Sequence, residues 1–350
     1  MNRAPRPPRR LFALVPAAVL IVALASVNVP YIALFPGPAR DVGALIEVDG
    51  VATHPSEGRL FLTTVQLGPL TLGQAVRAWL DDTITVIDRD LIYPPDRTPD
   101  EVDDENLRQM QQSQAFAAAA ALQHLGYRVN IVTSGARVIT VASDVPAAAV
   151  LRPGDVIVRA GGKAIQRSEQ LTSVVGDASV GAEIALTVKR SDEEIDVKVR
   201  TVERPGSDGE SIIGIFIETV ISDIELPLEL RIDAGEIGGP SAGLMFALGV
   251  IDVLREEDIT RGRVVAGTGE ITPDGVVGAV GAVAQKVVAA QRAGAELFLV
   301  PDDELEQACG VTETITVIGV RTLADALGFL AAPETADRTC GPAPVVGATG

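Results

Sequence analysis

The chain has 350 residues, enough for two domains with a sizeable core. Its formal net charge is −18, from 29 basic and 47 acidic residues, and this excess of acid disfavours nucleic acid or an anionic membrane surface as a partner. Aromatic residues make up only 3%, with no series of side chains on which bases could stack. The 47% apolar and 22% charged residues are ordinary for a globular protein.

The N-terminus departs from this acidic character. Residues 1–10 carry four arginines and no acid, and residues 11–35 contain no charge. A bilayer is spanned by roughly 20 apolar residues, so the pattern predicts a transmembrane anchor over 11–35 with residues 1–10 in the cytoplasm. The alternative is a signal peptide cleaved at Ala23-Leu24-Ala25, which has the small-x-small pattern. Both interpretations place the rest of the chain outside the cytoplasm.

Residues 36–126 form a membrane-proximal segment. Residues 58–65 have the composition of a strand and 70–81 that of a helix. The acidic, proline-containing stretch 94–106 is typical of a loop. A long helix rich in Ala, Leu and Gln follows, and Gly126 is expected to end it.

From 127 to 203 the chain alternates short strands with tight turns. Residues 144–175, DVPAAAVLRPGDVIVRAGGKAIQRSEQLTSVV, resemble a bacterial PDZ domain in the order of helix, Pro-Gly-Asp turn, strand and hairpin. The resemblance implies that an extended peptide is bound as an added strand. No clear Gly-Leu-Gly-Phe-like loop is present, which leaves recognition of C-termini open. The alternative is a small β module that acts only as a spacer or gate.

Residues 210–332 alternate strands and helices, which predicts an α/β domain with helices covering a sheet. Thr322 and Asp325 form a variant capping box for its last helix. Residues 333–350 are expected to form a C-terminal tail. Cys309 and Cys340 are the two cysteines, and an even number in an oxidising compartment suggests a disulfide that ties this tail to the domain. The alternative is two unrelated thiols.

One serine stands where a helix is expected to begin, in the sequence GEIGGPSAG over 235–243. Pro240 suits the first helical position, so Ser241 would lie in the first turn. Free backbone N–H groups gather there, and those of Gly239 and Ala242 could hold an oxyanion if Ser241 attacks a carbonyl. The plainer interpretation is that Ser241 only caps its own helix.

A nucleophilic serine needs a base, and the two histidines, His54 and His124, lie far upstream. Of four lysines only Lys286 follows residue 200. It shares an apolar helix stripe with Val283 and Val287, where burial would favour the neutral amine. A neutral amine beside a serine hydroxyl is a workable nucleophile–base pair. The alternative is a lysine whose stem covers apolar surface while its ammonium reaches water.

The motifs GGPSAG and TGEITPDGVVGAVGAVAQKVVAAQRAG (268–294) resemble the proteolytic domain of Lon-type proteases. The resemblance implies that Ser241 is the nucleophile, Lys286 the base, and Thr268 the residue that orients the lysine. Gly238 replaces the aspartate common in that family. Gly162-Lys163 fails the P-loop pattern, and we expect no ATP, other cofactor or metal.

Together these features resemble the exported, ATP-independent Lon-like proteases of Gram-positive bacteria. We therefore expect an α+β multidomain protein, with an N-terminal transmembrane helix, a PDZ-like β domain and a Lon-type α/β domain. The expected activity is cleavage of exported or membrane-associated proteins by a serine endopeptidase. Homo-oligomers are compatible with this interpretation. The alternative function is a catalytically silent scaffold that binds peptides or partner proteins.

Residues 58–80 are also similar to a Lon segment that precedes the serine motif. If so, 36–126 contain the first part of the Lon-like domain, and the PDZ-like domain is inserted into it.

Overall fold

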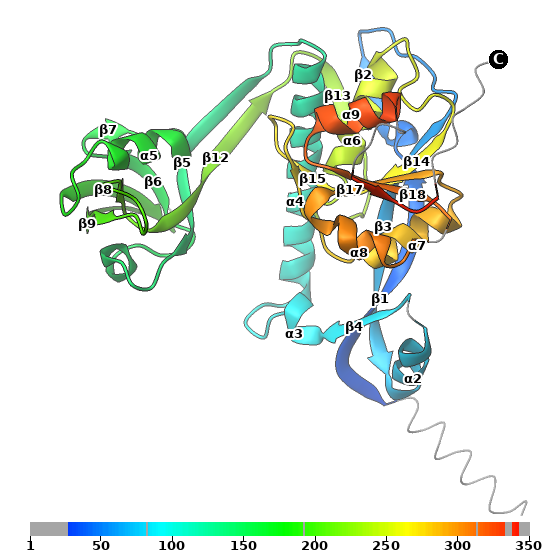
Figure 1. The fold of residues 1–350 in the computed structure, drawn as a ribbon, viewed down its shortest axis with the longest axis horizontal. Coiled ribbons are helices and arrows are strands. Elements are labelled where there is room, and N and C mark those ends of the chain that lie inside the picture. Colours follow the sequence, from blue (N-terminus) through cyan, green and yellow to red (C-terminus); the bar gives the residue numbers. More distant parts are fainter. Residues whose placement is uncertain (1–26, 82, 192, 313, 333–337, 343–350) are drawn as a thin grey trace, which may run out of the picture. The chain divides into compact units, whose positions relative to one another are not determined.

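The computed structural model describes residues 27–81, 83–191, 193–312, 314–332 and 338–342. The chain divides into two compact units (Figure 1). The first combines residues up to Arg128 with those from Leu226 onward, and the second is Val129–Glu225.

The first unit is built on a seven-stranded sheet in the order β19-β18-β17-β14-β3-β1-β4. Its strands are β1 (Asn28–Asp41), β3 (Arg59–Thr71), β4 (Thr85–Asp88), β14 (Val264–Gly267), β17 (Leu297–Pro301), β18 (Thr316–Val320) and β19 (Thr339–Cys340). The four central strands β18, β17, β14 and β3 are parallel, and the outer pairs are antiparallel. Apart from partly exposed Val264, the residues of β14, β17 and β18 are all buried, as in parallel sheets covered on both faces.

Helices cover this sheet on two faces (Figure 1). Leu297 and Leu299 of β17 pack with α4 (Pro99–His124), α6 (Gly243–Leu254) and α9 (Leu323–Ala331). The alternate residues Phe298 and Val300 pack with α7 (Val283–Arg292) and α8 (Leu305–Cys309). Successive side chains of a strand point to opposite faces, so one apolar strand serves both cores.

Shorter elements complete the first unit. They are α2 (Leu72–Leu80), α3 (Arg89–Ile92), the 3-10 helices η1 (Gly43–Leu45) and η3 (Asp302–Glu304), and the strand pairs β2 (Ile46–Asp49) with β13 (Glu229–Ile232) and β15 (Glu270–Ile271) with β16 (Val277–Gly278).

The second unit is an antiparallel sheet in the order β12-β5-β6-β8-β9, with β7 paired to β6. Its elements are β5 (Asn130–Val141), η2 (Pro146–Ala149), β6 (Val156–Ala160), β7 (Lys163–Ala164), α5 (Ser168–Gly176), β8 (Glu183–Arg190), β9 (Glu193–Arg200), β10 (Val202–Glu203), β11 (Ser211–Ile212) and β12 (Ile215–Glu225). A separate apolar core lies between this sheet, η2 and α5.

The predicted anchor over 11–35 is wrong at its C-terminal end. Residues from Asn28 onward form β1, which lies between β3 and β4 and packs against α7. This strand is buried at Ile32, Ala33 and Leu34. A strand that is covered on both faces has consecutive apolar residues, which explains the apolar run. Residues 1–26 lie outside the described residues. Among the helices that are described, none is both long and apolar enough to cross a bilayer.

One predicted boundary also changes. Residues 211–225 belong with the second unit, because β12 pairs along its length with β5, whereas we expected 210–332 to be one domain. The first unit includes the N-terminal part, since β3 pairs in parallel with β14 at Arg59–Val264 to Leu62–Gly267. The second unit is therefore inserted into the chain of the first.

The loop expected over 94–106 is largely helical. Thr98 begins α4, since its hydroxyl accepts from the N–H of Glu101, whose carboxylate accepts from the N–H of Thr98. Pro99 then occupies the first helical position. The acidic composition of this stretch reflects a favourable helix N-terminus rather than a loop.

The C-terminal segment is partly ordered into the sheet rather than being only a tail. Thr339 and Cys340 form β19 against β18, and Cys309 and Cys340 are joined by a disulfide with a Cα–Cα distance of 5.8 Å.

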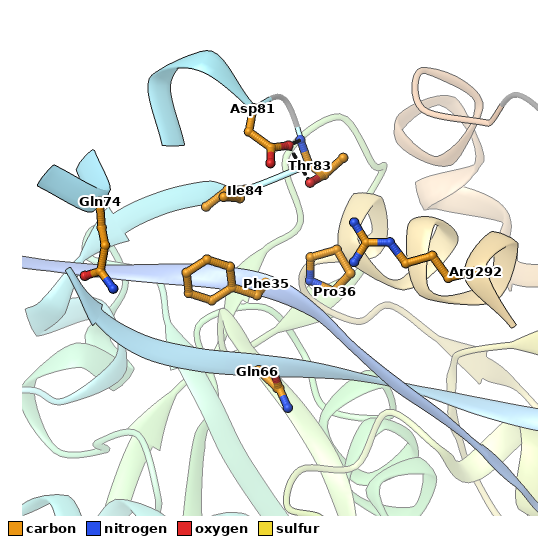
Figure 2. Close-up of a pocket in the computed structure, with 8 residues that line it drawn as sticks. All are labelled: Phe35, Pro36, Gln66, Gln74, Asp81, Thr83, Ile84 and Arg292. Atoms are coloured by element: carbon orange, nitrogen blue, oxygen red, sulfur yellow. Dashed lines mark hydrogen bonds between the residues drawn. The ribbon is translucent and has the colours of Figure 1, made fainter. Parts of the chain in front are cut away.

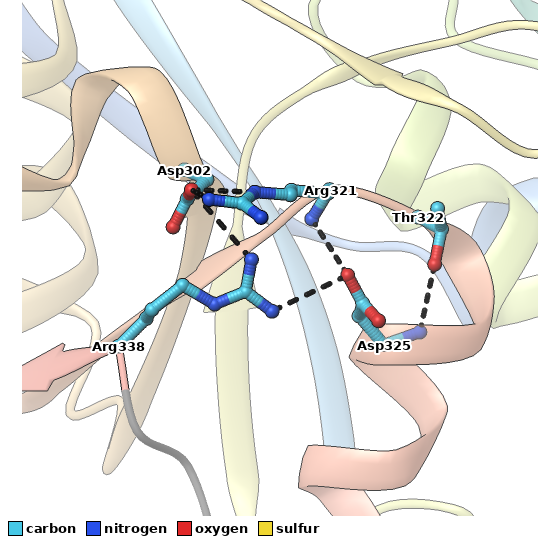
Figure 3. A network of polar contacts seen from close by, with 5 residues as sticks. All are labelled: Asp302, Arg321, Thr322, Asp325 and Arg338. Atoms are coloured by element: carbon cyan, nitrogen blue, oxygen red, sulfur yellow. Dashed lines mark hydrogen bonds and ion pairs between the residues drawn. The ribbon is translucent and has the colours of Figure 1, made fainter.

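Beside β19, Figure 3 shows Arg338 and Arg321 converging on Asp302, while Asp325 accepts from the backbone N–H of Arg321. Thr322 caps α9 by accepting from the N–H of Asp325. The expected variant capping box therefore forms, with the Asp325 carboxylate bonding one residue earlier than in the usual motif.

The disulfide closes a loop of 31 residues that contains β18 and α9. Replacing both cysteines with serine should lower the free energy of unfolding by about 4 kcal/mol, because the unfolded chain regains loop entropy. Urea denaturation followed by circular dichroism measures the change. Reduction of the wild-type disulfide should reproduce it, and equal midpoints for all three samples would contradict the prediction.

Candidate functional site

Ser241 lies in a turn directly before α6 and is half-buried. The helix begins at Gly243 with Ala242 as its N-cap, three residues later than the start that we predicted at Pro240. No side chain caps this helix, so Ser241 is not the capping residue of the plainer interpretation. Its carbonyl oxygen accepts a hydrogen bond from the N–H of Gly269 at 2.9 Å, which fixes the serine against the link between β14 and β15.

Helix α4 supports the serine loop from the other side. The Ser113 hydroxyl donates to the carbonyl of Pro240 at 2.8 Å, and the N–H of Gly239 donates to the carbonyl of Asn106 at 2.8 Å. A Cβ atom on Gly238 would lie 2.9 Å from the Cβ of Asn106. A side chain at position 238 would therefore require α4 or the serine loop to shift.

The prediction that the Gly239 N–H could hold an oxyanion needs correction, because that N–H is engaged with Asn106. The N–H groups of Ser241 and Ala242 make no hydrogen bond within the described part of the chain. They lie at the N-terminus of the twelve-residue helix α6, where the helix dipole favours negative charge.

Lys286 lies in the first half of α7 and is only 4% exposed. Val283, Val287 and Ala290 of the same helix face are fully buried, as the apolar stripe predicted. Burial lowers the pKa of the Lys286 amine from its usual 10.5 to about 8, although the charges of Glu304 and Glu270 act in the opposite direction. The alternative of an ammonium that reaches water is thus wrong.

Thr268 connects the lysine to the serine loop. The Lys286 Nζ atom donates to the Thr268 Oγ1 atom at 3.1 Å, and the Thr268 hydroxyl donates to the carbonyl of Ser241 at 3.0 Å. Thr268 is 1% exposed, and its own N–H donates to Leu299 of β17 at 2.9 Å. Among the described residues no hydrogen bond joins the Ser241 hydroxyl directly to Lys286, so the link runs through Thr268.

Sequence reasoning missed two carboxylates near the lysine. Glu270 follows Thr268 by two residues, and Glu304 lies in η3 at the end of β17. Burial raises the pKa of both carboxyls, and the Lys286 charge lowers both. Glu270 is part of the TGEIT motif (268–272), so the sequence offered it as a candidate site residue. Nothing in the sequence places Glu304 beside Lys286.

Figure 2 shows a pocket of about 330 Å³ elsewhere in the first unit. It is lined by Phe35, Pro36, Gln66, Gln74, Asp81, Thr83, Ile84 and Arg292. None of the predicted site residues lines it, so this pocket and the Ser241–Lys286 constellation are separate features.

The second unit carries its own groove, with a volume of about 650 Å³. Leu171 and Val175 of α5 line one side, and residues 215–217 of β12 line the other. Because β12 is the outermost strand of its sheet, its far edge has no strand partner within the described residues. A groove between a helix and an edge strand is suited to an extended peptide that adds to the sheet.

Two parts of the chain match known domain families. Residues 123–201 match the PDZ domain, and residues 228–327 match the Lon protease (S16) C-terminal proteolytic domain. Ser241, Thr268 and Lys286 all lie within the second match.

Relatives agree with these matches over short stretches. Over 91 residues the chain is 33% identical to "Lon protease 2" of Bacillus subtilis, covering 26% of this chain and 16% of that protein. Over 65 residues it is 46% identical to "Lon protease" of Clostridioides difficile, covering 19% of this chain and 8% of that one. The chain thus spans only a small part of these relatives.

Among solved structures, the PDZ domain of the SdrC-like protein from Listeria monocytogenes is 27% identical, with a TM-score of 0.24, and covers 25% of this chain and 92% of that domain. The sequence matches show that the chain contains a PDZ domain and a Lon-type proteolytic domain.

Proposed function

We propose that the protein is an ATP-independent serine endopeptidase whose nucleophile is Ser241 and whose base is Lys286. The observation that carries the proposal is a buried lysine whose amine is held by Thr268, the same hydroxyl that binds the serine loop. The match of residues 228–327 to a proteolytic domain supports it.

In the proposed reaction the neutral Lys286 amine takes the proton of the Ser241 hydroxyl as its oxygen attacks the scissile carbonyl. The N–H groups of Ser241 and Ala242 stabilise the resulting oxyanion. Lys286 then delivers the proton to the leaving amine, and water hydrolyses the acyl-enzyme with the amine again acting as base. Arginine could not replace the lysine, because its guanidinium stays protonated.

The groove between α5 and β12 is the proposed binding place for an extended segment of the substrate. Its Leu171, Val175 and residues 215–217 are apolar, which favours apolar side chains in the peptide. Backbone hydrogen bonds to the β12 edge would make such binding tolerant of sequence.

A membrane location is also part of the proposal. The charge-free stretch 11–26 precedes β1. Several large apolar side chains are exposed near the start of β1 and on the elements beside it. These are Val27, Tyr31, Leu67, Leu72, Leu80, Val86 and Leu91. We propose that residues 11–26 hold the protein at the membrane, with both units outside the cytoplasm.

Ser241→Ala should abolish cleavage of an unfolded protein substrate, and Lys286→Arg should do the same because charge is kept while basicity is lost. Losses of at least about 1000-fold in kcat/KM are expected. An acylating probe directed at serine should label the wild type at Ser241. A wild type that is neither labelled nor active would instead favour the silent scaffold, and an active Ser241→Ala variant would refute the nucleophile.

Thr268→Val should lower kcat by about 100-fold, because the Lys286 amine loses its acceptor and the serine loop loses a donor. Thr268→Ser is the matched control, since it keeps the hydroxyl and should retain most activity. Steady-state kinetics on a quenched peptide measure both. Equal activity of the valine and serine variants would show that the hydroxyl has no role.

The full chain should remain with membranes after an alkaline carbonate wash, whereas a variant lacking residues 1–26 should be released. Protease added to intact cells should digest the full-length protein at its exposed units. Release of the full chain by carbonate, or its complete protection in intact cells, would contradict the proposed location.

A further inference from the structure

Glu304 contacts the short segment before α7, the helix that carries Lys286. One of its carboxylate oxygens, Oε2, accepts a hydrogen bond from the N–H of Val280 at 2.9 Å. Val280 lies between β16 and α7, two residues before Ala282, which begins the helix in a left-handed conformation with φ of 57°. The N–H of Lys286 donates to the carbonyl of Ala282 at 3.2 Å, so this short segment determines where the lysine emerges.

The turn that carries Glu304 is itself held in place. Asp302, two residues earlier in η3, pairs with Arg321 at 2.7 Å and with Arg338 at 3.6 Å (Figure 3). A Cβ atom on Gly319 would lie 2.9 Å from the Oδ1 atom of Asp302, so the turn packs closely on β18. Glu304 therefore projects from a fixed support rather than from a free loop.

The charge of Glu304 also acts on the lysine. Glu304 on η3 and Glu270 on β15 are the charged groups of the described residues whose fields favour the ammonium form of Lys286. Asp303, the neighbour of Glu304, acts in turn on the Glu304 carboxyl. Such a carboxylate opposes deprotonation of the amine that the proposed reaction needs.

We propose that Glu304 is a positioning residue with two roles, holding the start of α7 for Lys286 through Val280 and setting, by its negative charge, the pH range in which the Ser241–Lys286 pair is active. This inference rests on the proposed function. Because the working base is the neutral amine, activity should rise with pH through the Lys286 pKa of about 8 and then level off. The carboxylate keeps the enzyme restrained in mildly acidic surroundings.

Glu304→Gln separates the two roles. The amide oxygen can still accept from Val280, but the negative charge is gone, so Lys286 should lose its proton more readily. We expect kcat/KM at pH 6.5 to rise about three- to tenfold over the wild type, with little change at pH 9.5. Glu304→Ala also removes the acceptor and should lower kcat across the whole range.

Glu306→Gln is the matched control, because Glu306 is an exposed carboxylate in α8 of the same region and should leave the pH profile unchanged. Profiles are measured from pH 5.5 to 9.5 with a quenched peptide, and thermal unfolding is followed for each variant. A Glu304→Gln profile that coincides with the wild type overturns the charge role. A uniform loss of activity in both Glu304 variants, with lowered Tm, also overturns the charge role. Glu304 would then contribute only to the stability of the fold.

Failure of this inference is distinguishable from failure of the proposed function. If Ser241→Ala is inactive and the Glu304→Gln profile is unchanged, only the role of Glu304 is wrong. If the wild type has no activity that depends on Ser241, the proposed function itself fails.

Discussion

The hydrogen bond from the Lys286 amine to the Thr268 hydroxyl joins three layers of the first unit. Lys286 comes from α7 on one face of the sheet, Thr268 from the end of the central strand β14, and the Ser241 loop from the start of α6 on the other face. Helices on both faces of the sheet bury the lysine while its amine reaches the loop of the opposite layer through Thr268. The altered basicity of Lys286 follows from that burial.

Support for this contact comes from parts of the chain that are distant in sequence. Helix α4 precedes the inserted unit, yet Asn106 and Ser113 bind the loop that carries Ser241. Strand β3 lies beside β14 and so helps to place Thr268. The insertion therefore interrupts the sequence of the first unit without interrupting its sheet, because β5 and β12 begin and end the second unit as an antiparallel pair.

Local patterns predicted much of the site. Glycines and a proline around Ser241 indicated a helix start, which lies three residues later than predicted, and the apolar stripe around Lys286 indicated burial. The same kind of pattern failed over residues 28–35, since an apolar run satisfies a bilayer and a covered sheet equally well. It also failed at Thr98, where an acidic stretch was interpreted as a loop although its carboxylates favour a helix N-terminus.

The sequence by itself determined the chemical character of the site: a serine before an apolar helix, one lysine in the C-terminal half, and a threonine in the motif between them. Only the tertiary structure decided that Gly238 must lack a side chain because α4 approaches it, that the N–H of Gly239 is occupied, and that Glu304 lies near Lys286. These facts depend on which elements become neighbours in space. Periodicity and spacing describe only the residues within one helix or strand. They therefore cannot predict contacts between elements that are distant in sequence.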